Sequence, residues 1–164
     1  RTLQNNRARS VSAATRLLAN SEYTREQIWR SYGVNAPVCY YGVDCEKFFP
    51  TPEVQKQNRV VSVGEMTPRK GFDFLIESLA VIPAGRRPDL TIASNYVNPQ
   101  ELEHLQNLAR QHNVQLNVLT NLNADQLREE YNRARLFVYS PVNEPLGLAP
   151  LEAMACGTPV VGLA

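Results

Sequence analysis

Short apolar runs alternate with amphipathic stretches along the chain from residue 59 onward. Each run is short, rich in branched apolar residues and bounded by turn-forming residues, which is typical of a buried β-strand. Five such runs predict strands at Arg59–Gly64, Asp89–Ser94, Val114–Thr120, Leu136–Pro141 and Pro159–Ala164. Strands that alternate with helices form parallel sheets. The pattern therefore predicts an α/β fold with a parallel sheet of about five strands and flanking helices.

Two stretches between these runs place apolar residues on one helical face, so both helices are expected to pack on the sheet. The first face consists of Phe72, Leu75, Ile76, Leu79 and Ala80, and the second of Leu102, Leu105, Leu108 and Ala109. Asn98, Pro99 and Glu101 supply an N-cap, a first-turn proline and an acid, and they mark where the second helix begins. A shorter helix is expected to begin near Asn123.

The first part of the chain is less regular. We assign residues 1–57 to the end of one domain and an interdomain segment, and residues 58–164 to a second domain. The polar segment Thr51–Asn58 has no apolar period and is typical of a linker. Before it, the pattern predicts a strand at Leu17–Asn20, a helix from about Thr24 and a strand at Val38–Gly42.

These few elements offer little surface against which the nearby aromatic side chains could be buried. The side chains are Trp29, Tyr32, Tyr40, Tyr41, Phe48 and Phe49. We therefore expect residues 1–50 to form a helix and strand appendage that is the end of a larger domain. In isolation it should be loosely packed or pair with another copy of the chain.

The composition excludes several classes of function. Seventeen basic residues nearly balance 16 acidic ones, and the net charge is +1. The chain as a whole therefore lacks the positive electrostatic field that attracts nucleic acid. Cys39, Cys45 and Cys156 lack a paired spacing, which argues against a structural metal and favours a reducing compartment. No apolar run approaches the ~20 residues of a membrane helix. The chain is expected to be soluble and cytoplasmic.

A ligand crevice is expected where the order of the parallel strands reverses. With the common order 3-2-1-4-5, the first and fourth strands are neighbours, and the loop Glu65–Gly71 faces the loop Val142–Ala149. In the first loop, Arg69 and Lys70 precede a helix, where the macrodipole disfavours cations unless an anion such as a phosphate is bound. The alternative is a pair of solvated basic residues. Gly64 and Gly71 would allow a sharp turn and a close backbone approach to a ligand.

The second loop carries two carboxylates, Glu144 and Glu152. Carboxylates accept charge-assisted hydrogen bonds from sugar hydroxyls, which suggests a hydroxyl-rich ligand. Gly147 could present an amide to a phosphate or sugar oxygen. A local explanation also exists for Glu152, because a helix that begins at Pro150 would place this acid in its stabilising first turn.

These residues resemble a known family. The segment EPLGLAPLEAMACGTPVVG is similar to the E-x7-E motif of the group one retaining glycosyltransferases, which have the GT-B fold with Rossmann-like domains. The segment VGEMTPRKGFDFLIESL resembles the start of the first helix of their donor domain. NSEYTREQIWRSYG and YYGVDCEKFFP resemble their interdomain segment.

The resemblance implies transfer of a sugar from a nucleoside diphosphate sugar with retention of configuration, without a cofactor or bound metal. It implies that Glu144 contacts the donor sugar in the catalytic centre and that Glu152 contacts the ribose. The other donor-binding residues that it implies are Gly64, Arg69, Lys70, Asn121, Leu122, Gly147 and Leu148. The acceptor would be bound by an N-terminal domain outside this sequence, so the chain alone is not expected to turn over. The longer protein would be cytoplasmic or peripheral to the inner face of the membrane.

One departure from the family pattern concerns charge. The family usually has arginine after the first glycine and often an acid before the lysine, whereas Glu65 and Arg69 hold these positions here. Arg69 could take over the phosphate contact, or Glu65 could repel a diphosphate or pair with Arg69. Alternative functions are a sugar-nucleotide epimerase or phosphorylase of the same fold, and a non-catalytic nucleotide-binding or interaction module.

Overall fold

A computed structural model of the chain describes residues 10, 11 and 13–163. Ala164, the last residue of the fifth predicted strand, and the start of the predicted appendage lie outside the described residues. The chain forms two compact units. The N-terminal unit extends to Gly42 and includes Glu144–Gly147, and the sheet unit consists of Val43–Asn143 and the residues from Leu148 onward.

The sheet unit contains five parallel strands, as the sequence predicts. They are β1 (Arg59–Val63), β2 (Asp89–Ser94), β3 (Leu116–Thr120), β4 (Leu136–Tyr139) and β5 (Val160–Gly162). Their order is β3-β2-β1-β4-β5, so the assumed order is confirmed. Val60 of β1 pairs with Leu90 of β2 on one side and with Leu136 of β4 on the other. The strand order therefore reverses at β1 and β4.

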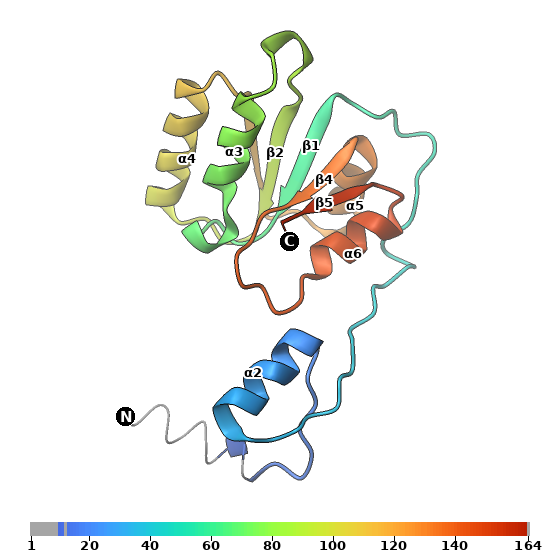
Figure 1. The fold of residues 1–164 in the computed structure, drawn as a ribbon. Coiled ribbons are helices and arrows are strands. Elements are labelled where there is room, and N and C mark those ends of the chain that lie inside the picture. The colour runs from blue at the N-terminus through green and yellow to red at the C-terminus, as the bar shows by residue number, and fades with distance from the viewer. Residues whose placement is uncertain (1–9, 12, 164) are drawn as a thin grey trace. The chain divides into compact units, whose positions relative to one another are not determined.

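Helices cover both faces of this sheet (Figure 1). On one face, α3 (Phe72–Ala80) and α4 (Pro99–Gln111) enclose a core that includes Val60. On the other face, α5 (Ala124–Arg133) and α6 (Leu148–Ala155) enclose a second core that includes Val61. Neighbouring residues of β1 thus point to opposite faces, because side chains alternate along a strand. The expected apolar faces of the first two helices lie against the first core.

Local capping signals place two of these helices where the sequence predicts them. Asn98 caps α4 by accepting hydrogen bonds from the backbone amides of Gln100 and Glu101. Asn123 and Gln126 form a reciprocal capping box at the start of α5. Each cap satisfies amides that the first helical turn leaves without a partner inside the helix.

The segment between Val43 and Asn58 is tied to α5. The backbone amide of Thr51 donates to Oδ1 of Asn132 at 2.7 Å, and Nδ2 of Asn132 donates to the carbonyl of Phe49. Arg128 lies over the Phe49 ring, 4.4 Å from its centroid. Phe48 is buried in the second core. The chain that precedes β1 therefore belongs to the packing of the sheet unit.

The N-terminal unit differs from its predicted elements. Its helix, α2 (Glu22–Tyr32), begins before Thr24 because Ser21 is the N-cap and accepts a hydrogen bond from the amide of Thr24. The strands predicted at Leu17–Asn20 and Val38–Gly42 are wrong, since the described residues there form only one parallel bridge, between Ala19 and Val38. A single bridge is not a sheet in which alternating side chains could be buried on one face.

Gly71 provides a stability test of the sheet unit. Its φ is +64°, and a Cβ at this position would lie 2.6 Å from the carbonyl oxygen of Ser140. We expect Gly71→Ala to lower the free energy of unfolding by about 1–3 kcal/mol, because it adds both backbone strain and a clash. Urea titrations followed by circular dichroism measure the change. The control is Gly85→Ala in the short helix η2 (Ala84–Arg86), where the added Cβ meets no atom within 4 Å. An equal effect of both substitutions would contradict this account.

Candidate donor site

The loop after β1 is attached to the chain that leaves β4. The hydroxyl of Ser140 donates to the carbonyl of Lys70 at 2.9 Å, and the backbone amide of Val142 donates to the carbonyl of Arg69 at 3.3 Å. Arg69 and Lys70 lie in the short helix η1 (Pro68–Lys70), and Gly71 separates it from α3. The cationic turn therefore lies at the strand reversal, next to the chain that follows β4.

The two cations of this turn differ in their surroundings. A Cβ at Gly64 would lie 3.2 Å from Cδ of Lys70, so the half-buried Lys70 stem crosses directly over this glycine. Arg69 is exposed. Glu65 and Arg69 form no ion pair with each other or with another residue in the part of the chain that the structure describes. The alternative in which Glu65 forms an ion pair with Arg69 is therefore wrong.

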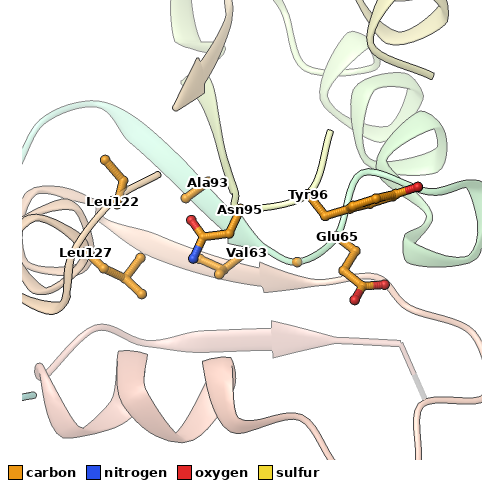
Figure 2. A pocket seen from close by; sticks show the side chains of 8 residues that line it. Val63, Glu65, Ala93, Asn95, Tyr96, Leu122 and Leu127 are labelled. Atoms are coloured by element: carbon orange, nitrogen blue, oxygen red, sulfur yellow. The ribbon is translucent and has the colours of Figure 1, made fainter. Parts of the chain in front are cut away.

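A pocket of about 300 Å³ opens beside this turn at the carboxyl ends of β1 and β2. Its mostly apolar lining consists of Val63, Gly64, Glu65, Ala93, Asn95, Tyr96, Leu122 and Leu127. Figure 2 shows the Asn95 carboxamide next to Val63, with Leu122 and Leu127 to one side and the Tyr96 ring and Glu65 to the other. An apolar wall with one amide suits a flat heteroaromatic ring whose edge carries donors and acceptors.

Hydrogen bonds hold the loops that form the pocket. The carbonyl of Tyr96 accepts from the amide of Met66 at 2.8 Å and from the hydroxyl of Ser94 at 2.6 Å. After β3, Asn121 adopts a left-handed conformation with φ of 56° and directs the chain toward α5. Leu122 lines the pocket, whereas Asn121 does not. The structure thus brings Gly64 and Leu122, both predicted as site residues, to one cavity.

Glu152 lies in the second turn of α6, because this helix begins at Leu148. The helix does not begin at Pro150, so the alternative explanation of Glu152 as a first-turn acid does not apply. Instead, the hydroxyl of Tyr131 donates to Oε2 of Glu152 at 2.8 Å. Burial, followed by the charge of Glu152, raises the pKa of Tyr131 well above its ordinary value. Tyr131 therefore remains a hydrogen-bond donor at neutral pH.

The remaining predicted residues divide between the two units. Leu148 is the first residue of α6 in the sheet unit. Glu144 and Gly147 belong to the segment that groups with the N-terminal unit. Within the sheet unit, the cationic turn lies beside the pocket, and Glu152 is joined to α5 through Tyr131.

Sequence reasoning missed four residues of this site: Asn95, Tyr96, Leu127 and Tyr131. The first two follow a predicted strand at the expected edge of the sheet, so their position was a usable signal. Leu127 and Tyr131 are four residues apart in α5 and share one helical face. That spacing indicates packing on the sheet and carries no chemical signal of its own.

No group of three or more His, Cys, Asp or Glu residues in the described part of the chain could hold a metal ion. None of the helices described has both the length and the apolar character needed to cross a membrane.

The family described as "Glycosyl transferases group 1" matches residues 44–164. The chain is 34% identical over 107 residues to the serotype-specific mannosyltransferase WbdA of Escherichia coli, covering 63% of the chain and 13% of WbdA. It is 32% identical over 162 residues to a GDP-mannose-dependent phosphatidylinositol monomannoside mannosyltransferase of Mycolicibacterium smegmatis, covering 86% of the chain and 42% of the relative.

A solved structure shares the fold. HepE of Anabaena, in complex with UDP and glucose, matches with a TM-score of 0.87 at 20% identity, covering 98% of the chain and 48% of HepE. The chain spans less than half the length of each of these three proteins.

Cys156 offers a test of the packing beneath Glu152. Burial raises the pKa of its thiol to about 11, whereas Cys39 and Cys45 are exposed. We expect a thiol reagent at mildly alkaline pH to modify Cys39 and Cys45 quickly and Cys156 only after denaturation, because the thiolate is the reactive form. Absorbance of the released reagent measures the reaction. Cys156→Ser should leave the native reaction unchanged and remove the slow one. Rapid modification of Cys156 in the native chain would contradict the packing described.

Proposed function

The chain belongs to the group 1 glycosyltransferases, and from this membership we propose that its sheet unit binds the donor of a retaining sugar transfer. The donor is a nucleoside diphosphate sugar. The observation that carries the proposal is the pairing, at one edge of the sheet, of the apolar pocket with the cationic turn of Arg69 and Lys70. An apolar cavity beside two cations matches a ligand with an aromatic base at one end and a diphosphate further along.

In this proposal the nucleobase occupies the pocket. The ring of Tyr96 stacks on the base, and the Asn95 carboxamide reads its edge, since it offers both a donor and an acceptor. Leu122 and Leu127 cover the other side. The names of the relatives include GDP-mannose for one and UDP for another, so both nucleotides are candidate ligands of this chain.

Arg69 and Lys70 then hold the diphosphate. When the bond from the anomeric carbon to the diphosphate breaks, its electron pair stays with the departing phosphate oxygen, where negative charge develops. Two cations at fixed positions stabilise that charge without rearrangement, which is an efficient form of electrostatic catalysis. This arrangement can replace a metal ion. Arg69 assumes the phosphate contact that the family usually gives to an arginine at the position of Glu65.

The two acids have separate roles in this proposal. Glu152 accepts hydrogen bonds from the ribose hydroxyls, and Glu144 orients the donor sugar in the catalytic centre. Backbone amides near Gly147 and Leu148 assist at the phosphate or sugar. Retaining hydrolases use two carboxyl groups about 5 Å apart, one of them as a nucleophile, and this proposal assigns Glu144 no such role.

The acceptor is bound, in this proposal, by a domain of a longer protein, and the chain alone does not turn over. The matched family and the relatives named above are glycosyltransferases, which favours transfer over an epimerase, a phosphorylase or a non-catalytic module.

The charge of Lys70 is the first test. We expect the 164-residue chain to bind UDP or GDP weakly, and Lys70→Met to weaken the tighter nucleotide about tenfold or more, because a charged contact to phosphate is lost. Methionine preserves the apolar stem over Gly64. Isothermal titration calorimetry at millimolar nucleotide measures both constants. Arg86→Ala, which removes an exposed cation elsewhere in the sheet unit, is the control and should change nothing. If neither UDP nor GDP gives heat of binding, the proposed donor site is refuted.

A second test separates the base from the diphosphate. We expect Tyr96→Ala to weaken the nucleotide about fivefold through lost stacking and to leave the affinity for inorganic pyrophosphate unchanged. Lys70→Met should weaken both ligands. Competition titrations give the two affinities. Phe74→Ala removes an exposed ring of α3 that does not line the pocket and serves as the control. An equal loss of pyrophosphate affinity in Tyr96→Ala would show that the ring does not contact the base.

A further inference from the structure

Tyr131 is the largest fully buried side chain of those described, and it carries a polar group into an apolar core. Its ring packs edge-on against Phe48 and Phe137, with centroids 6.0 and 5.8 Å away. Phenylalanine would make these same ring contacts. Packing therefore explains the aromatic ring and leaves the hydroxyl unexplained.

The hydroxyl has one partner, Oε2 of Glu152. Burying a hydroxyl without an acceptor costs free energy, so the fully buried Tyr131 depends on this carboxylate. The backbone of Tyr131 is also held. The hydroxyl of Thr158 donates to the carbonyl of Tyr131 at 2.6 Å, and Nζ of Lys56 donates to the Thr158 hydroxyl at 3.0 Å. Tyr131 is thus fixed at both its ring and its main chain.

Glu152 is only half-buried, and its two oxygens are used differently. Oε2 is held by Tyr131, whereas Oε1 has no hydrogen bond or ion pair with any residue described. A glutamate on a helix surface normally samples several rotamers, and fixing it costs conformational entropy. The hydrogen bond from Tyr131 to Oε2 removes part of the rotamer freedom of Glu152 before a ligand binds. It leaves Oε1 available for the ligand.

The position of this pair relative to the pocket comes from α5. Leu127, which lines the pocket, lies one helical turn before Tyr131 and on the same face. In a nucleotide, the ribose is the group attached directly to the base. A carboxylate held by the residue one turn from the base pocket is therefore placed for the sugar that follows the base.

We propose that Tyr131 is a positioning residue for donor recognition: its hydroxyl holds Glu152 in the orientation in which the carboxylate accepts hydrogen bonds from the ribose hydroxyls. The inference rests on the proposed function, specifically on the contact of Glu152 with ribose. Tyr131 itself does not touch the donor. Because burial and the neighbouring carboxylate raise its pKa, the tyrosine retains its proton and acts only as a donor.

Ribose selectivity distinguishes this role from a purely structural one. The affinities of UDP, GDP and their dideoxyribose analogues are measured by calorimetry for the 164-residue chain and for Tyr131→Phe. We expect the unmodified chain to prefer the ribose form of its nucleotide about tenfold, because hydrogen bonds to a charged group are lost in the analogue. Tyr131→Phe should lose most of this preference by weakening the ribose form, with the affinity of the dideoxyribose form unchanged.

Phe137→Leu is the matched control. It removes one ring contact of Tyr131 without touching the hydroxyl, so it should lower the unfolding midpoint and retain the ribose preference. If Tyr131→Phe does not fold, Glu152→Asp serves instead, because the shorter side chain keeps the charge but withdraws it from the Tyr131 hydroxyl. This variant should also lose the preference.

The outcomes separate the inference from the proposed function. A ribose preference that survives in Tyr131→Phe overturns the inference alone. Where Glu152→Asp replaces that variant, a surviving preference overturns the ribose contact of Glu152 and the inference with it. Binding of nucleotide without any ribose preference in the unmodified chain overturns the role of Glu152 and the inference with it. Absence of binding by either nucleotide overturns the donor site as a whole.

Discussion

The candidate site depends on a close backbone contact between two segments that are distant in sequence. At Gly71 the chain passes so near the carbonyl of Ser140 that a side chain would not fit, and φ is positive there. The Ser140 hydroxyl and the Val142 amide then bind the carbonyls of the two cationic residues. The parallel order places β1 beside β4, so this contact is a consequence of topology. The fold itself therefore holds the cations next to the pocket, in a chain whose net charge is close to zero.

Much of the fold could be predicted because its signals are local. Alternating apolar runs and helical faces indicate a parallel sheet, and Asn98 and Asn123 mark helix starts through their own side-chain hydrogen bonds. The wrong predictions concern segments whose secondary structure does not follow from local sequence preference alone. The apolar run around Ala19 found one bridging partner and no sheet. Helix α6 includes Leu148 and Ala149 before Pro150, since proline is tolerated throughout a first turn, where its missing amide has no helical partner.

The candidate site was less predictable than the fold. Its charged residues stand out in a sequence because charges near a turn or a proline need an explanation. Tyr96 and Tyr131 do not stand out, since aromatic residues near strands and helices are normally part of a core. Only the three-dimensional arrangement shows that one ring lines a pocket and that the other carries a hydroxyl to Glu152. The least predictable residues are those whose chemistry depends on a partner from another element.

The spacing of Leu127 and Tyr131 on α5 makes this helix intolerant of changes in length. One added or deleted residue between them would rotate everything beyond it by about 100° around the helix axis. The pocket wall would stay in place while the phenol turned away from the carboxylate, and the buried face of the helix would be mismatched with the sheet. We therefore expect substitutions along α5 to be tolerated more readily than insertions or deletions between Leu127 and Tyr131.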